Sequence, residues 1–156
     1  LVEKDNEIVH KHIDFHIFAT LNPSEYVYLY PGTKDLSQAF ASRWPIFRHV
    51  NFLPEDIECN LIKKNYNFLS ITVIRQMVKV ANLSRKLMDE GKLTFVFSAR
   101  VLKNWAQLSE RFGILNAAEL AFIGHMDSSS RAIMITEVLD VATKLDISEL
   151  KIKYVK

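Results

Sequence analysis

Two short segments in the first third of this chain have the composition of β-strands, and most of the sequence after them has the spacing of helices. Residues 13–20 are mostly apolar and are predicted to form a strand buried on both faces. Residues 46–52 form a second predicted strand, opened by Pro45. Two strands cannot make a stable sheet alone. We therefore expect these strands to pair with residues absent from this chain or with another chain.

From Pro54 onward the sequence predicts a bundle of four or five helices. Pro54 is followed by acids that suit the first turn of a helix. Ser70 is predicted to cap a long helix that ends before Gly91, and Ser98 to cap another that ends before Gly113. The chain is thus expected to divide near residue 54, with the end of an α/β layer over 1–53 and a helical subdomain with a C-terminal tail over 54–156.

Further helices are predicted with weaker signals. A short helix is expected over residues 35–43. Asn116 and Glu119 resemble a capping box, in a helix closed by Gly124, and serines 128–130 are expected to open a last helix. The alternating tail, residues 147–156, suggests a short edge strand or an ordered arm.

The composition narrows the classes of partner. The 156 residues carry a formal net charge of +2, which gives no strong electrostatic reason to bind nucleic acid or an anionic membrane. No apolar run approaches the length of about 18 residues that a membrane span needs. Cys59 is the single cysteine, so no intramolecular disulfide is possible. A reducing compartment, and hence a cytoplasmic location, is expected.

Three polar residues stand at the borders of predicted elements. The apolar segment over residues 17–23 (IFATLNP) stops at Asn22, which places an amide at the carboxyl end of a strand, where ligands of open α/β sheets bind. Arg43 and Arg100 follow in that order, each at the end or the start of a predicted helix. This arrangement suggests a site that binds nucleotide phosphates.

The stretches around these residues resemble a known family. Residues 15–23 (FHIFATLNP) and 36–44 (LSQAFASRW) resemble the pattern FxxxATxNP…LSxAFxxRF of AAA+ ATPases in the MoxR, midasin and dynein-related group. Residues 100–105 (RVLKNW) are similar to the LRDLxRW helix start of midasin modules. The chain has no G-x-x-x-x-G-K-[ST] phosphate loop and no apolar strand ending in paired acids, which normally precede these stretches. It therefore resembles the second half of an AAA+ module.

The resemblance implies a fold and three functional residues. The fold is α/β: the C-terminal part of an AAA+ core, with about two strands, followed by an all-helical lid. Asn22 would be the sensor-1 residue that positions the attacking water, Arg43 the arginine finger acting in trans, and Arg100 the sensor-2 arginine. We therefore expect Asn22 and Arg43 to be catalytic, and Asn22 and Arg100 to contact the nucleotide.

Each of the three residues also has a purely structural interpretation. Asn22 fits an Asx turn before a proline. Arg43 fits a solvated arginine at a helix C-terminus, where a cation is favourable. Arg100 fits an ion pair with Glu110 or Glu90.

The same resemblance implies an activity and partners. The complete module would bind ATP and Mg²⁺, hydrolyse ATP and remodel a protein client within a homo- or hetero-oligomeric ring. The lysine, magnesium ligands and catalytic acid would lie upstream, so this chain alone is not expected to bind ATP tightly. One alternative is a non-catalytic helical interaction module that has lost the ATP-binding half. Another is a motor subunit acting on nucleic acid, which the balanced charge disfavours.

Other polar clusters are weaker candidates. His10 and His12 share one face of a strand pattern with His16 nearby, but no cysteine or paired carboxylate completes a metal site, so no metal is predicted. Tyr26, Tyr28 and Tyr30 recur at period two in a loop, which favours packing or a partner contact.

Overall fold

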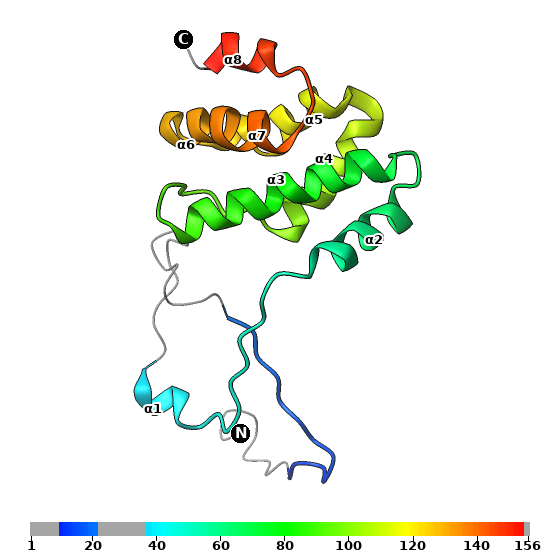
Figure 1. Cartoon of the computed structure of the whole chain (residues 1–156). Helices are drawn as coiled ribbons and strands as arrows, with labels where there is room; N and C mark the ends of the chain where they lie inside the picture. Colours follow the sequence, from blue (N-terminus) through cyan, green and yellow to red (C-terminus); the bar gives the residue numbers. More distant parts are fainter. Residues whose placement is uncertain (1–9, 22–36, 155–156) are drawn as a thin grey trace, which may run out of the picture. The chain divides into compact units, whose positions relative to one another are not determined.

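A computed structural model of the chain describes residues 10–21 and 37–154. The chain divides after Arg43 into two compact units, residues 1–43 and 44–156. The described part of the first unit contains one short helix, whereas the second unit is a bundle of helices (Figure 1). Asn22 and the loop with Tyr26, Tyr28 and Tyr30 lie outside the described residues.

The strand predicted over residues 13–20 does not form. Residues 15–21 have no regular secondary structure, and the side chains of Ile13 and Phe18 are each 90% exposed. A strand is held by hydrogen bonds to a neighbouring strand, and no segment that the structure describes supplies them.

The helix predicted over residues 35–43 is present in a shorter form. Helix α1 spans Gln38–Ala41, and the Ser37 hydroxyl accepts a hydrogen bond from the backbone N–H of Phe40 at its start. Arg43 follows in the turn after the helix, where its backbone N–H donates to the Phe40 carbonyl oxygen.

The strand predicted over residues 46–52, at the start of the second unit, is also wrong. The segment has no regular secondary structure, and Ile46 and Val50 are 74% and 88% exposed. The reason is the same as before: the helical bundle that follows contains no strand edge in its described residues. What remains of the predicted fold class is therefore its helical part.

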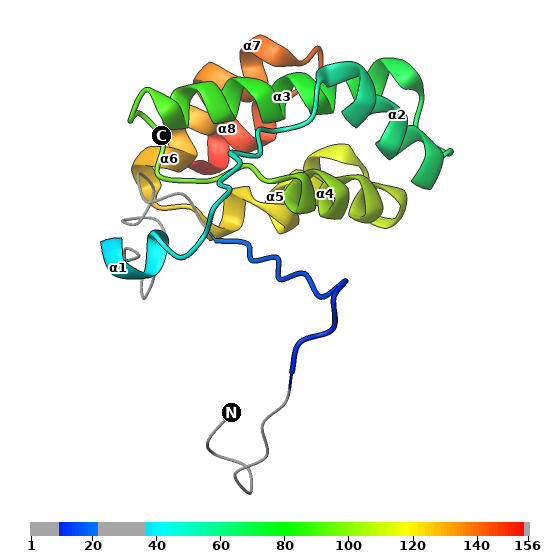
Figure 2. The same ribbon diagram turned by 90° about the horizontal axis from the view of Figure 1, so that it is seen from below.

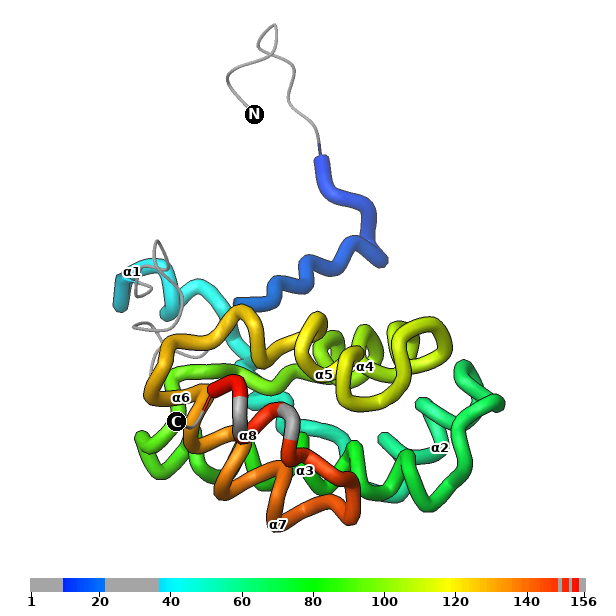
Figure 3. The backbone as a smooth tube through the Cα atoms, turned by 90° about the horizontal axis from the view of Figure 1, so that it is seen from above, coloured from blue at the N-terminus to red at the C-terminus, as the bar shows by residue number. Residues whose placement is uncertain are grey.

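The helical prediction from Pro54 onward is confirmed. Helix α3 lies at the centre of the bundle, with α2 and α4 against it on one side and the run from α6 to α7 on another, while α8 lies across that run (Figures 1 and 3). Within that run the helix widens to π geometry over Met134–Leu139. The helices are α2 (Glu55–Asn65), α3 (Ile71–Asp89), α4 (Ala99–Phe112), α5 (Ile114–Ala121), α6 (Ser128–Ile133), α7 (Asp140–Ala142) and α8 (Ser148–Tyr154), with a 3₁₀ turn at Ile123–His125.

The predicted caps of the two longest helices are in place. The Ser70 hydroxyl accepts from the N–H of Val73, and the Ser98 hydroxyl from that of Val101. Gly91 and Gly113 have φ values of +72° and +73°, a backbone conformation that glycine adopts without steric cost after a helix.

Two local predictions are wrong. Asn116 is no N-cap, because Gly113 already ends α4 and begins α5, which leaves Asn116 inside the helix. For the tail, the edge strand, one of the two alternatives, is wrong, because Ser148–Tyr154 form helix α8. Ile147 and Leu150, three residues apart, are 3% and 6% exposed, so helical spacing puts both apolar side chains into the bundle.

An aromatic cluster holds the connection between α3 and α4. Residues 93–97 run extended along the bundle (Figure 2). The ring of Phe97, which is fully buried, packs edge to face on Phe122 at a centroid distance of 5.0 Å, and Phe122 packs on Trp105 at 5.2 Å. Leu93 and Phe97, at the two ends of the connection, are buried and anchor it to the bundle. Among the described helices none is long and apolar enough to cross a membrane.

The start of α6 carries a carboxylate whose charged form is strongly favoured. Asp127 is the N-cap, and hydrogen bonds from the backbone N–H and the hydroxyl of Ser130, then from the hydroxyl of Thr94, lower its pKa to about 2. The Asp127–Thr94 bond is 2.8 Å long and ties the connection over residues 93–97 to α6.

We predict that this cap stabilises the fold in a pH-dependent way. The folded pKa lies below the ordinary value of 3.8, so the contribution is complete above about pH 4 and is lost as the pH falls through about 2. Asp127→Ala should cost about 1 kcal/mol at pH 7. In thermal unfolding, the difference between wild type and Asp127→Ala should shrink between pH 4 and pH 2, whereas Asp127→Asn, which caps without titrating, should not lose its advantage over alanine. A constant wild-type difference over that range would contradict the assignment.

Candidate functional site

A pocket of about 320 Å³ lies between α2 and the beginning of α4. The α2 residues that line it recur at intervals of three and four, and therefore share one face of the helix. Its wall is mostly apolar, and two cationic side chains from the first turns of α4, Arg100 and Lys103, line it. The lining residues are Glu58, Leu61, Ile62, Asn65, Tyr66, Ala99, Arg100, Leu102 and Lys103.

Arg100 is the second residue of α4 and is exposed. The first turn of α4 contains no acidic residue. No residue that the structure describes forms an ion pair with Arg100, and the suggested partner Glu90 is bonded instead to Lys92 at 2.8 Å. A cation at a helix N-terminus is unfavourable, so Arg100 stands where free N–H groups and its own charge both favour an anion.

Lys103 belongs to the same site, although the sequence analysis did not select it. It is exposed, lines the pocket and follows Arg100 by three residues, so both cations lie on one face of α4. That spacing was the available signal. The only acid in the lining, Glu58, is 1% exposed and does not neutralise them, because its carboxylate is already paired.

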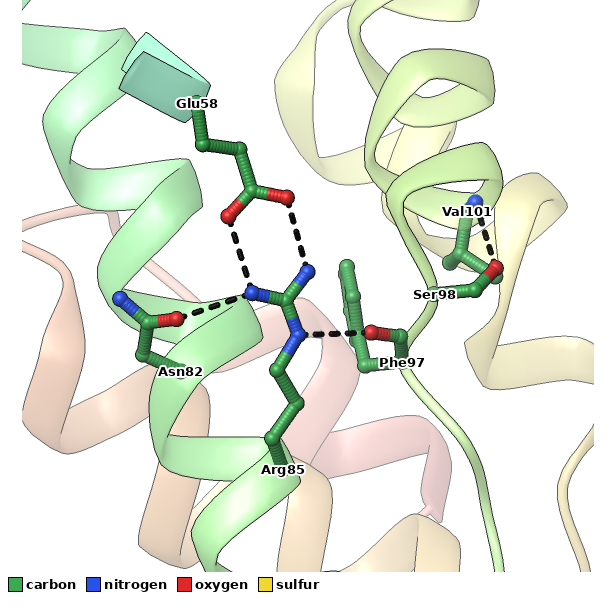
Figure 4. Close-up of polar contacts among 6 residues, drawn as sticks. All are labelled: Glu58, Asn82, Arg85, Phe97, Ser98 and Val101. Atoms are coloured by element: carbon green, nitrogen blue, oxygen red, sulfur yellow. Dashed lines mark hydrogen bonds and ion pairs between the residues drawn. The ribbon is translucent and has the colours of Figure 1, made fainter. Parts of the chain in front are cut away.

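The partner of Glu58 is Arg85 on α3, and the pair is buried (Figure 4). The guanidinium donates two hydrogen bonds to the carboxylate, from Nη2 to Oε1 at 2.8 Å and from Nη1 to Oε2 at 2.9 Å. Arg85 is 4% exposed. A buried pair of this kind is tolerated when further donors are also satisfied, as they are at Nη1 and Nε. Nη1 also donates to Asn82 at 2.9 Å, and Nε donates to the Phe97 carbonyl oxygen at 2.9 Å.

Sequence reasoning missed this pair because its members are 27 residues apart. One signal was present. Arg85 follows Ala81 by four residues and Val78 by seven, so an arginine stands within the apolar stripe of α3. A buried arginine requires an acid, and Glu58 supplies it.

The other predicted residues are placed as follows. Arg43 is exposed in the turn after α1, in the first unit. Asn22 lies outside the described residues. The histidines at positions 10, 12 and 16 are exposed, and the described part of the chain contains no group of three or more His, Cys, Asp or Glu side chains that could hold a metal. Burial raises the pKa of the Cys59 thiol, so it is not a reactive thiolate at neutral pH.

The comparison with known proteins identifies the helical unit. Residues 58–140, more than half of the chain, match the family model described as CbbQ/NirQ/NorQ C-terminal. The chain belongs to this family. This family corresponds to the lid region of MoxR-type AAA+ modules. The resemblance seen in the sequence is therefore confirmed.

A curated relative agrees with this assignment. The CbbQ/NirQ/NorQ-type chain is 30% identical over 137 residues to the aerobic cobaltochelatase subunit CobS of a Sinorhizobium species. The aligned region covers 83% of the chain. The match spans 41% of the relative's own length. No solved structure matches the chain significantly.

We predict that Glu58 and Arg85 depend on each other for stability. Glu58→Met or Arg85→Met alone leaves a buried charge unpaired and should cost about 3–5 kcal/mol. The double variant should be more stable than either single variant, because no charge remains buried. Urea unfolding of all four proteins measures the coupling. Strictly additive losses would show that the two side chains do not act as a pair.

Proposed function

We propose that this chain is the lid and the adjoining end of the core of an ATP-hydrolysing AAA+ module, which works in a ring to remodel a protein partner. We place the start of the lid at Pro54. Membership of the lid family supports the module. The observation that carries the role of the lid is the pair Arg100 and Lys103, two cations without an acidic partner among the described residues, at the N-terminus of α4 and on the wall of a pocket.

The chemistry of this pocket suits a nucleotide. A helix N-terminus binds phosphate through its free N–H groups, and an arginine adds a planar fork of donors for phosphate oxygens. Leu61, Ile62 and Leu102 offer an apolar wall for a base or sugar. A volume of about 320 Å³ falls at the lower end of the range of ligand pockets, roughly 300–1,000 Å³.

The residues on the described part of the chain fit phosphate better than magnesium. No acidic or histidine cluster accompanies Arg100 and Lys103. When ATP is bound, Mg²⁺ would neutralise charge on its phosphates, with ligands from the ATP-binding half of the module. The contribution of this chain is then to close over the nucleotide and to report its presence through Arg100.

Two further residues complete the proposal. Asn22 would orient the attacking water, since an amide both donates and accepts hydrogen bonds. Arg43, exposed at the end of α1, would reach the active site of a neighbouring subunit and stabilise charge on the transferred phosphoryl group. CobS is named as a subunit of a cobaltochelatase, and we infer by analogy that the client of this module is a protein partner in a larger complex.

The first test of this proposal concerns Arg100 in the module completed by its ATP-binding half. Arg100→Ala should change the free energy of unfolding by no more than about 0.5 kcal/mol, as expected of an exposed side chain. It should weaken ATP binding and abolish the ATP-dependent protection of the lid from hydrogen exchange. Lys103→Ala should weaken binding in the same direction.

Arg111→Ala is the matched control, because this exposed arginine lies at the other end of the same helix. It should leave ATP binding and lid protection unchanged. Should Arg100→Ala lower the melting temperature while ATP still protects the lid, the arginine has a structural role and the proposal loses its main support.

The second test concerns Arg43 in the same completed module. Arg43→Ala should leave ATP affinity nearly unchanged and lower turnover by about 10³-fold or more, as the loss of an arginine finger does. Mixing this variant with subunits that lack a functional phosphate loop should restore part of the activity, because each supplies what the other lacks. Turnover equal to wild type would remove Arg43 from the mechanism.

A further inference from the structure

Arg85 joins three segments of the chain that meet beside the pocket. Its guanidinium binds Glu58 of α2, and its Nε donates to the carbonyl oxygen of Phe97, at the end of the connection between α3 and α4 (Figure 4). The guanidinium also lies over the ring of Phe52, 4.0 Å from the centroid. Phe52 belongs to the segment by which the chain enters the bundle.

The contact with Phe97 fixes the start of α4. Phe97 is followed directly by Ser98, the N-cap, and Arg100 is the second residue of the helix. The Phe97 ring is held by Phe122 on its other side, so backbone and ring are both fixed. The direction in which α4 leaves this point decides where Arg100 and Lys103 stand along the pocket.

The geometry requires an arginine. The planar guanidinium uses Nη1 and Nη2 for the carboxylate and keeps Nε for the carbonyl. A lysine ammonium is a single point charge, which can pair with Glu58 but cannot bond both partners with the same rigidity. Glu58 itself lines the pocket, so this pair links the wall of the pocket to Phe97, the residue that precedes the N-cap of α4.

We propose that Arg85 is a positioning residue for Arg100. By binding Glu58, Phe52 and the Phe97 carbonyl together, it sets the start of α4 relative to α2 and to the entering segment, and thereby holds Arg100 and Lys103 at the pocket. This inference rests on the proposed function in one respect only, the role of Arg100 toward an anion.

The test is Arg85→Lys, studied by hydrogen exchange of individual amides. The Leu102 amide, which donates to the Ser98 carbonyl oxygen, reports on the start of α4, and the Gly113 amide, which donates to Ser109, reports on its end. Loss of a hydrogen bond from a charged donor should speed exchange at Leu102 by about tenfold relative to Gly113. Equal acceleration at both ends would reflect a general loss of stability and would overturn the proposal.

Two matched variants separate the contacts of Arg85. Asn82→Ala removes a hydrogen bond to Nη1 and leaves Nε on Phe97, so the ratio of Leu102 to Gly113 exchange should stay at its wild-type value. Glu58→Gln lowers overall stability but keeps the carbonyl contact, and it should also leave that ratio unchanged. A selective effect of Asn82→Ala equal to that of Arg85→Lys would overturn the proposal.

A measurement on the wild-type chain covers the case in which Arg85→Lys does not fold. The Nε–H group of Arg85 is buried and bonded to Phe97, and its NMR signal should exchange with water much more slowly than that of the exposed Arg111. Equal exchange rates at the two arginines would overturn the proposal.

Kinetics of the completed module separate this inference from the proposed function. Arg85→Lys should raise the KM for ATP in parallel with Arg100→Ala, with a smaller effect on kcat, and Asn82→Ala should leave KM unchanged. If Arg100→Ala leaves KM unchanged while Arg85→Lys still loosens Leu102, the proposed function fails and the geometric role of Arg85 stands. If Arg100→Ala raises KM but Arg85→Lys does not, the positioning role fails and the proposed function stands.

Discussion

The helical unit is organised around the need to satisfy one buried arginine. Moving Arg85 and Glu58 out of water costs free energy that their mutual attraction offsets only when the geometry is good and every other donor is bonded. Here Asn82, the Phe97 carbonyl and the Phe52 ring complete the set. These partners come from α2, α3 and the two irregular segments beside them. An arrangement of the bundle that displaced any of these segments would leave a charge or a donor unsatisfied, so the pair disfavours such arrangements.

The two cations at the start of α4, beside this pair, have no such partners among the described residues. Glu58 has two strong donors on its carboxylate, whereas Arg100 and Lys103, on the neighbouring helix, have no acidic partner among the described residues. The contrast is informative because both groups line the same pocket. The acid that lines the pocket, Glu58, pairs with Arg85 of α3 and not with Arg100 or Lys103. The positive charge left at the start of α4 is therefore available to an external anion.

Local signals predicted the helices well and the pairing of segments poorly. Serine caps, glycines with positive φ and the apolar stripe of α3 act over a few residues, so Ser70, Ser98, Gly91 and Gly113 could be assigned from sequence. The strands over 13–20 and 46–52 could not, because apolar composition shows only that a segment can join a sheet and not that partners are present. Of the residues that line the pocket, the sequence analysis selected Arg100 from its motif, and its role toward a nucleotide stays a prediction. Glu58, 27 residues from Arg85, gave no local sign of its role. The capping-box pattern at Asn116 failed because Gly113, three residues earlier, had already begun the helix.

The irregular segment over residues 46–52 affects how this chain behaves when it is synthesised and when it is produced alone. Its apolar side chains, Ile46, Phe47 and Val50, are more than half exposed, and its backbone forms no ladder. Such a segment is a ready template for pairing with other chains. The bundle that follows is built largely from contacts between helices that are neighbours in sequence, and folds of this kind form quickly. Produced alone, the chain would thus combine a rapidly formed bundle with an unpaired apolar segment, and would tend to self-associate. In the complete module that we propose, the preceding half leaves the ribosome first, so the sheet edge that would pair with this segment would form before the segment emerges.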